Sequence, residues 1–211
     1  QEAQDDAQRL AWLVKLAALL DEGLDRADEA VETYLEVLKL EADHPAALDA
    51  LERIYTTTNR PRDLAGSLQR KRAKAEGADR RALTFRLGQL FAGPLEDEEA
   101  AIASFREVLD GEPGHADSVA ALEKYLGKPK HRYEVAKFLE PHFLAANNFP
   151  KLAWVLQVIS EGTPQGSERL ELIKRMKPLD FSLDEMGDLL GVLDRINEPG
   201  IDAEEHEALL E

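Results

Sequence analysis

Leucine and alanine recur along the chain at the three- to four-residue spacing that places apolar side chains on one face of a helix. In the first third of the chain the apolar positions with this spacing are Leu13, Leu16, Leu20, Tyr34, Leu38, Leu48, Leu51, Tyr55, Leu64 and Leu68. Turn-forming segments rich in Gly, Pro, Asn and Asp separate them at 21–23, 42–45, 59–61 and 76–77. The pattern predicts four successive amphipathic helices, grouped as two helix pairs of about 35 residues each.

The same pattern then repeats. Residues 9–55 align with residues 80–126, and 14 of these 47 positions are identical. The segment HPAALDALERIY at 44–55, for example, returns as HADSVAALEKYL at 115–126. The repeat continues at the same spacing, because Asp63-Leu64-Ala65 matches Glu134-Val135-Ala136. A third copy of the Leu64-Ala65-x-x-Leu68-Gln69 pattern follows at Leu152-Ala153-x-x-Leu156-Gln157. A helix pair that repeats in this way cannot bury its apolar face alone and has to stack on its neighbours.

Bulky, small and aromatic residues recur at fixed places in each pair. They are Trp12, Leu16, Ala17, Leu20, Ala30, Tyr34 and Val37 in one copy, and Leu83, Leu87, Gly88, Phe91, Ala101, Phe105, Val108 and Pro113 in the other. In this respect the chain resembles the tetratricopeptide repeat family over about residues 5–178, although Glu52 and Leu64 stand where that family usually has small residues. The resemblance implies an all-α, right-handed superhelical solenoid of about five antiparallel helix pairs, over residues 1–178. Residues 179–211 lose the repeat, and Ser182–Glu185 is a capping box, so we expect an acidic helical C-terminal cap there or the start of a further segment.

No pattern in the chain indicates catalysis, a metal site or a cofactor. There is no cysteine, no Gly-rich phosphate loop, no nucleophile elbow and no pair of histidines at metal-ligand spacing. His44 and His115 each precede a predicted helix, and we interpret them as turn residues. The acidic run 96–99 falls in the first turn of another predicted helix, where carboxylates interact favourably with the helix dipole. We therefore expect a protein that is not an enzyme and carries no cofactor.

The chain has a formal net charge of −16, which argues against nucleic-acid binding. No apolar run approaches the roughly 18 residues of a membrane span, so we expect a soluble protein. Its compartment is not encoded, and we favour the cytoplasm over the periplasm or secretion.

The charge is uneven, because residues 60–86 carry nine cations and three anions between acidic flanks. We name six of these cations the basic patch: Arg60, Arg62, Arg70, Lys71, Arg72 and Lys74. One interpretation is a docking patch for an acidic partner or for the acidic end of another copy. The other is a solvated helix face balanced by neighbouring acidic helices.

The resemblance also implies a concave groove lined by the first helix of each pair. Counted from the Leu-small positions, its predicted lining residues are Lys15, Asp49, Arg53, Phe85, Arg86, Gln89, Lys124 and Gln157. Four of them are cations, one on the first helix of each of the first four predicted pairs, which favours a partner with acidic groups. The family's clamp for a peptide carboxylate is absent, so recognition of a C-terminus is not implied. We predict a scaffold that binds a peptide or helical segment of a partner protein in this groove. The alternatives are an assembly module that self-associates through its charged ends, and a groove with no specific ligand.

Overall fold

A computed structural model describes residues 2–162, and every regular element within that range is helical. The elements are α1 (Glu2–Ala18), η1 (Leu19–Gly23), α2 (Ala27–Leu40), α3 (Pro45–Thr57), α4 (Pro61–Lys74), α5 (Gly77–Ala92), α6 (Glu98–Gly111), α7 (Ala116–Glu123), η2 (Lys124–Gly127), α8 (Arg132–Ala145) and α9 (Phe149–Gly162). Of the two short elements, η1 is a π-helical turn and η2 a 3₁₀ turn. The prediction of an all-α helical solenoid is confirmed. The predicted cap at 179–211, with its capping box, lies outside the described residues.

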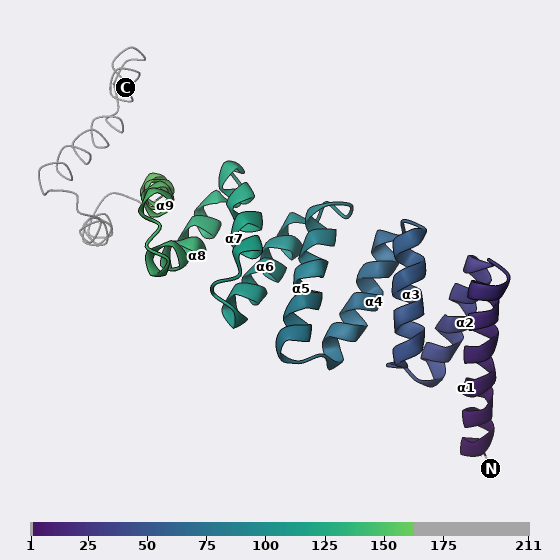
Figure 1. The fold of residues 1–211 in the computed structure, drawn as a ribbon. Helices are drawn as coiled ribbons and strands as arrows, with labels where there is room; N and C mark the ends of the chain where they lie inside the picture. The colour runs from purple at the N-terminus through teal and green to yellow at the C-terminus, as the bar shows by residue number, and fades with distance from the viewer. Residues whose placement is uncertain (1, 163–211) are drawn as a thin grey trace, which may run out of the picture. The chain divides into compact units, whose positions relative to one another are not determined.

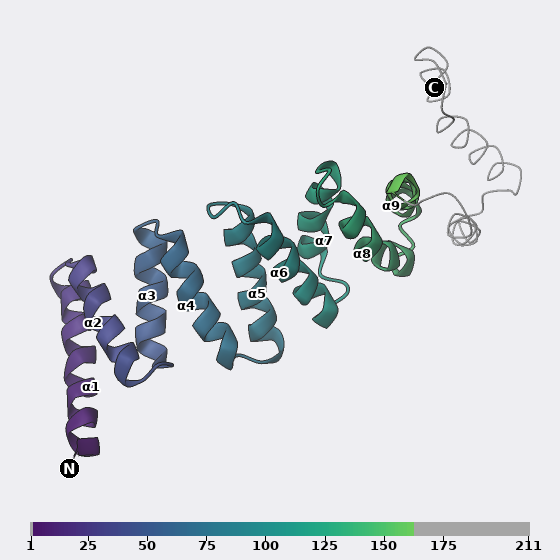
Figure 2. The ribbon, with the colours of Figure 1, turned by 180° about the vertical axis from the view of Figure 1, so that it is seen from behind.

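The chain divides into two compact units, Gln1–Leu122 and Glu123–Glu211. In the first unit α1 to α6 follow one another in space in their chain order, alternating in direction (Figure 1), and the same order is seen from behind in Figure 2. Each of these helices except the last packs against its successor, and together α1 to α5 bury one continuous apolar cluster. This is the nearest-neighbour packing that a helical repeat requires.

Within the pairs α1–α2 and α5–α6, a small residue on the first helix and an aromatic residue on the second hold equivalent places. Gly88 of α5 is buried and lies directly against Phe105 of α6, which is also buried. Ala17 and Tyr34 hold the equivalent places in α1 and α2, and both are buried. The small residues let the two helices approach closely, and the aromatic rings fill the space that remains.

The turn inside each pair of the first unit has one conformation. Asp25, Asn59 and Glu96, which precede the second helices, all have left-handed backbone with φ of 53–54°. In each case the next residue's N–H donates to a carbonyl near the end of the first helix, as in the 2.9 Å bond from Arg60 N to Tyr55 O. This turn therefore marks the passage from a first helix to its second helix.

A different turn, with a histidine in it, leads into a first helix. The N–H of His44 donates to Glu41 O at 3.1 Å, and the ring Nδ1 of His44 accepts from Ala47 N at 3.3 Å, which caps α3. His115 repeats the arrangement at α7, where its Nδ1 accepts from Ser118 N at 3.2 Å. The interpretation of both histidines as turn residues is confirmed.

In the second unit the turn found inside a pair recurs between α8 and α9. The N–H of His131 donates to Lys128 O before α8, but bonds of the same span also occur inside pairs, at Asn59 and Glu96, so this bond does not set the place of α8 in its pair. Asn147 is left-handed with φ of 51°, and Asn148 N donates to Phe143 O at 2.9 Å, so α9 is the second helix of that pair. Residues 44–69 indeed match residues 132–157 at seven of 26 positions. Residues 134–139, which match the second-helix residues 63–68 at the 71-residue spacing, therefore lie in α8, the first helix of the α8–α9 pair, and α8 follows α7 and η2 directly.

Candidate binding groove

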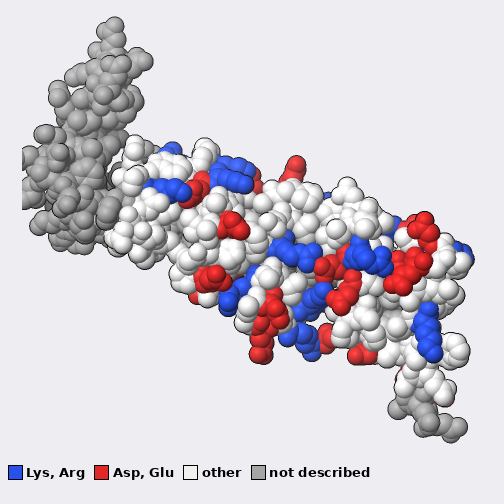
Figure 3. Space-filling model, in the orientation of Figure 1, with Lys and Arg blue, Asp and Glu red and all other residues white. Residues whose placement is uncertain are grey.

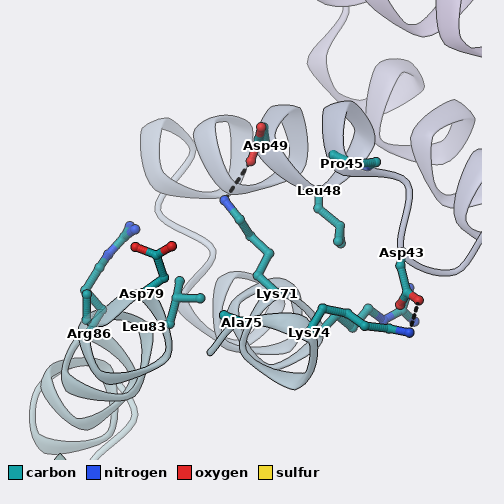
Figure 4. Close-up of a pocket in the computed structure, with 12 residues that line it drawn as sticks. Asp43, Pro45, Leu48, Asp49, Lys71, Lys74, Ala75, Asp79, Leu83 and Arg86 are labelled. Carbon is teal, nitrogen blue, oxygen red and sulfur yellow. Dashed lines mark hydrogen bonds and ion pairs between the residues drawn. The ribbon is translucent and has the colours of Figure 1, made fainter. Parts of the chain in front are cut away.

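A groove of about 510 Å³ opens between α3, α4 and α5 in the first unit. The N-terminal half of α3, the C-terminal part of α4 and the N-terminal half of α5 enclose it (Figure 4). Its lining residues are Asp43, Pro45, Leu48, Asp49, Arg70, Lys71, Lys74, Ala75, Asp79, Ala82, Leu83 and Arg86. The structure thus brings two residues of the predicted concave groove, Asp49 and Arg86, together with three residues of the basic patch.

The groove combines apolar surface with charged side chains. Leu48 and Leu83 extend into it from α3 and α5, on either side of Ala75 (Figure 4). Ala82 is an exposed small residue of the lining and leaves room above α5. Such a surface can bury apolar side chains of an extended or helical segment while charged groups fix its direction.

Glu52 of α3 connects the three helices, because it pairs with one cation on α4 and one on α5. Its side chain is 17% exposed and accepts from Lys71 Nζ of α4 and, at 2.5 Å, from Arg86 Nη1 of α5. Burial by itself raises the pKa of Glu52, but the hydrogen bonds and charges of Lys71 and Arg86 together outweigh it and hold that pKa below 4.5. The ionised carboxylate therefore joins one helix pair to the next.

Two further ion pairs line the groove. Lys71 Nζ also donates to Asp49 Oδ1 at 2.7 Å, and Lys74 Nζ lies 2.8 Å from Asp43 Oδ2 (Figure 4). Burial lowers the pKa of Lys71, yet the hydrogen bonds that it donates to Asp49 and Glu52, together with their charges, raise that pKa above 10.5. These lysines are therefore held as cations by carboxylates of the preceding segment.

The predicted groove cations have different surroundings. Arg53 of α3 is paired with Asp21 of η1, whose side chain is only 6% exposed, and Arg86 is paired with Glu52. Both cations thus reach back to the preceding first helix. Lys15 instead lies over the ring of Trp12 at 5.4 Å, and Lys124 is exposed on η2.

The remaining predicted groove residues lie on α5 and α9. Phe85 is half-buried, with its ring centroid 4.9 Å from that of His115 and 5.7 Å from that of Phe105. Gln89 is exposed on α5. Gln157 is exposed on α9, the second helix of its pair, so it does not share the first-helix positions of the others.

The basic patch is largely paired within the first unit. Its ion pairs are Arg60 with Asp28, Lys71 with Asp49 and Glu52, Arg72 with Glu107, and Lys74 with Asp43. Accordingly, Figure 3 shows acidic and basic side chains interspersed on the visible face. Within the described residues, Arg62 and Arg70 are the two members of the patch without an ion pair. This distribution favours the balanced-face interpretation for four of the six cations.

Sequence reasoning missed the central role of Glu52, although a signal was present. A glutamate at a place where related repeats carry a small residue is a charged group in a half-buried position, and such groups are normally paired. Its partners on the next two helices could not be read from the sequence alone.

Two absences can be stated for residues 2–162. No cluster of three or more His, Asp or Glu side chains in this range could hold a metal ion. Nor does any helix in it combine the length and apolarity needed to cross a membrane.

Comparisons with known proteins give structural likeness alone. No protein-family model matches the chain, and no curated protein matches it. Among solved structures, MamA is 19% identical, with 70% of this chain and 84% of MamA covered and a TM-score of 0.43. YrrB, described as a TPR protein with an unusual peptide-binding site, is 13% identical, with 77% and 90% covered and a TM-score of 0.35. PilF of Pseudomonas aeruginosa is 15% identical, with 98% of both chains covered and a TM-score of 0.31. The helix pairs and turns of the chain itself form a tetratricopeptide-like helical repeat.

Proposed function

We propose that the protein is an interaction scaffold that binds a peptide or helical segment of a partner protein in the groove between α3, α4 and α5. The supporting observation is the groove itself, which is lined by half-buried Leu83, exposed Ala82 and a cation, Arg70, that forms no ion pair with described residues. A segment with apolar residues and a nearby carboxylate fits this surface, since it satisfies both features at once.

The structure changes which substitutions can test this proposal. Reversing the charge of Arg53 or Arg86 would set a new carboxylate beside Asp21 or Glu52, so the helix stack itself would be weakened. Ala82→Trp fills the groove from an exposed position instead, and Ala103→Trp on α6 is its control at an exposed alanine outside the groove. Arg70→Glu has an equally close control in Arg62→Glu, on the same helix but outside the groove.

The experiment selects binding peptides from a random 12-residue library on the intact chain and measures their affinity by fluorescence anisotropy. We expect Ala82→Trp to weaken binding about tenfold or more, a loss of about 1.4 kcal/mol, and Ala103→Trp to leave it unchanged. Arg70→Glu should weaken binding chiefly at low salt, and Arg62→Glu should do so much less. Selected peptides that bind Ala82→Trp as well as the unsubstituted chain would show that this groove is not the binding site.

A further inference from the structure

A second surface, on α1 and α2, carries exposed apolar side chains. Trp12 and Leu16 are 71% and 46% exposed on α1, and Leu35 is exposed on α2. A shallow groove of about 460 Å³ lies between the two helices, lined by Leu13, Leu16, Glu32, Thr33, Leu35, Glu36 and Lys39. We call Trp12 together with these lining residues the α1–α2 face. It is separate from the groove of the proposed function.

The internal repeat shows what such a face binds in this chain. Leu16 is equivalent to Leu87 of α5 at the 71-residue spacing, and Leu87 is 0% exposed. Leu13 is equivalent to Thr84, which is likewise buried. Helix α4 packs against α5, and Leu68 of α4 belongs to the same buried cluster as Leu87. The face that is open on α1 is therefore covered on α5 by an amphipathic helix.

The charges around the two faces also correspond. Arg72 of α4 lies 3.3 Å from Glu107 of α6, and Glu107 is the repeat equivalent of Glu36 on α2. In the described structure Glu36 forms an ion pair with Lys39 one turn away, an exposed contact of small energy, and interacts electrostatically with Arg9, the repeat equivalent of the Arg80 that pairs with Glu107. No residue of the described structure takes the place of Arg72 at Glu36. The α1–α2 face thus presents both the leucine and the carboxylate that α4 meets at the equivalent place.

We propose that the α1–α2 face binds an amphipathic helix of a partner protein that has leucines at positions i and i+4 and a basic residue at i+8. Leu64, Leu68 and Arg72 of α4 have this spacing. The two leucines cover Leu13 and Leu16, and the basic residue pairs with Glu36. Burial of the apolar surface provides the affinity, and the ion pair fixes the direction of the helix.

A second copy of the chain is a poorer occupant on the same grounds. Among the described α-helices, α4 alone has two leucines and a basic residue at this spacing, and both of its leucines are buried within the chain. A copy would have to unfold its own α4 in order to offer it.

The test uses a synthetic peptide of residues 60–76 as the probe and the intact chain as the receptor. The peptide carries Gly66→Ala, which favours the helix at a position with no atom within 4 Å of an added Cβ. Leu16→Glu on the receptor should weaken binding about tenfold or more, measured by fluorescence anisotropy. Leu144→Glu, at a leucine of nearly the same exposure (45%) on α8, should leave binding unchanged.

A charge exchange tests the predicted direction of the helix. The peptide with Arg72→Glu should bind the unsubstituted chain more weakly, and Glu36→Arg on the receptor should restore its binding. Absence of peptide binding would overturn the proposal, and so would binding that Leu16→Glu leaves unchanged. The second result would place the peptide elsewhere, for instance in the position of a displaced α4. Sedimentation of the intact chain provides the other arm, because a dimer that Leu16→Glu dissociates would identify a second copy as the occupant and refute the partner helix.

Discussion

Replacement of Gly88 by alanine tests whether close approach of α5 and α6 depends on the missing side chain. An ideal Cβ on Gly88 would lie 2.7 Å from Cε1 and 2.9 Å from Cδ1 of Phe105. The ring is 1% exposed and cannot swing away as a flexible side chain would. The added methyl group must therefore displace the ring or move the two helices apart, at a cost of about 1–3 kcal/mol.

Glycine and alanine also differ in helix propensity, and Gly66 provides the control. Gly→Ala inside a helix gains about 1 kcal/mol, and nothing lies within 4 Å of a Cβ at Gly66 of α4. Gly66→Ala should therefore stabilise the chain by up to about that amount. Because the propensity contribution is common to both variants, the difference between their free energies of unfolding isolates the packing cost at Phe105, about 1–3 kcal/mol.

Urea unfolding followed by circular dichroism at 222 nm measures both variants, with the denaturant slope checked for equality. If Gly88→Ala proved as stable as Gly66→Ala, α5 and α6 would have to move apart without a cost in free energy of unfolding. That result would refute the interpretation of Gly88 as a close-packing residue, and it would mean that the pair relaxes freely to the Ala17–Tyr34 arrangement of α1 and α2.

Two further predictions concern Glu52 and the histidine turns. Because the pKa of Glu52 is lowered in the folded chain, the carboxylate stabilises the fold above about pH 4.5, and this stabilisation is lost as pH falls through the lowered pKa. Glu52→Gln should therefore be less stable than the unsubstituted chain at pH 7 and should lose less of its free energy of unfolding between pH 5 and about pH 3. Urea titrations at each pH measure both chains, and equal losses would contradict a role for this carboxylate. His44→Ala should lower the free energy of unfolding by about 1 kcal/mol through the lost cap, and His44→Asn should lower it very little. His115→Asn should lower it by a further amount of about 0.5–1.5 kcal/mol, because His115 also packs on Phe85. Thermal unfolding measures these variants, and equal stability of the two Asn variants would count against that ring contact.

The helix pairs could be predicted from the sequence because their determinants are local. The apolar spacing fixes which face of each helix is buried, and the 71-residue identity places the same small and aromatic residues in equivalent pairs, as Gly88 and Phe105 show. The turn histidines were predictable for the same reason, since a cap involves residues only three positions apart.

The interruption after α7 was harder to predict because the same residues fit two alignments. Val135, Ala136 and Leu139 are buried in α8, and that apolar pattern suits a second helix at a spacing of 71 residues as well as a first helix at a spacing of 88. The turns decide between the two, and a left-handed residue such as Asn147 is only weakly marked in the sequence. An asparagine shared by positions 59 and 147 was the available signal.

From the sequence alone, a cation that would contact a ligand cannot be told from a cation that pairs with a neighbouring helix. Arg53 and Arg86 were predicted to line the concave groove and Lys71 to belong to the basic patch, and each contacts a carboxylate of a preceding helix, over separations of 19 to 34 residues. Cations at this spacing hold neighbouring helices together whether or not a ligand is bound. The groove is consequently shaped by the same ion pairs that hold the helices in place, with Glu52 joining α3, α4 and α5. A substitution at Lys71 or Arg86 alters the shape of the site together with its charge, so a loss of binding in such a variant cannot be assigned to a contact with the ligand. Only positions outside this network, such as Ala82 and Arg70, can report on recognition itself.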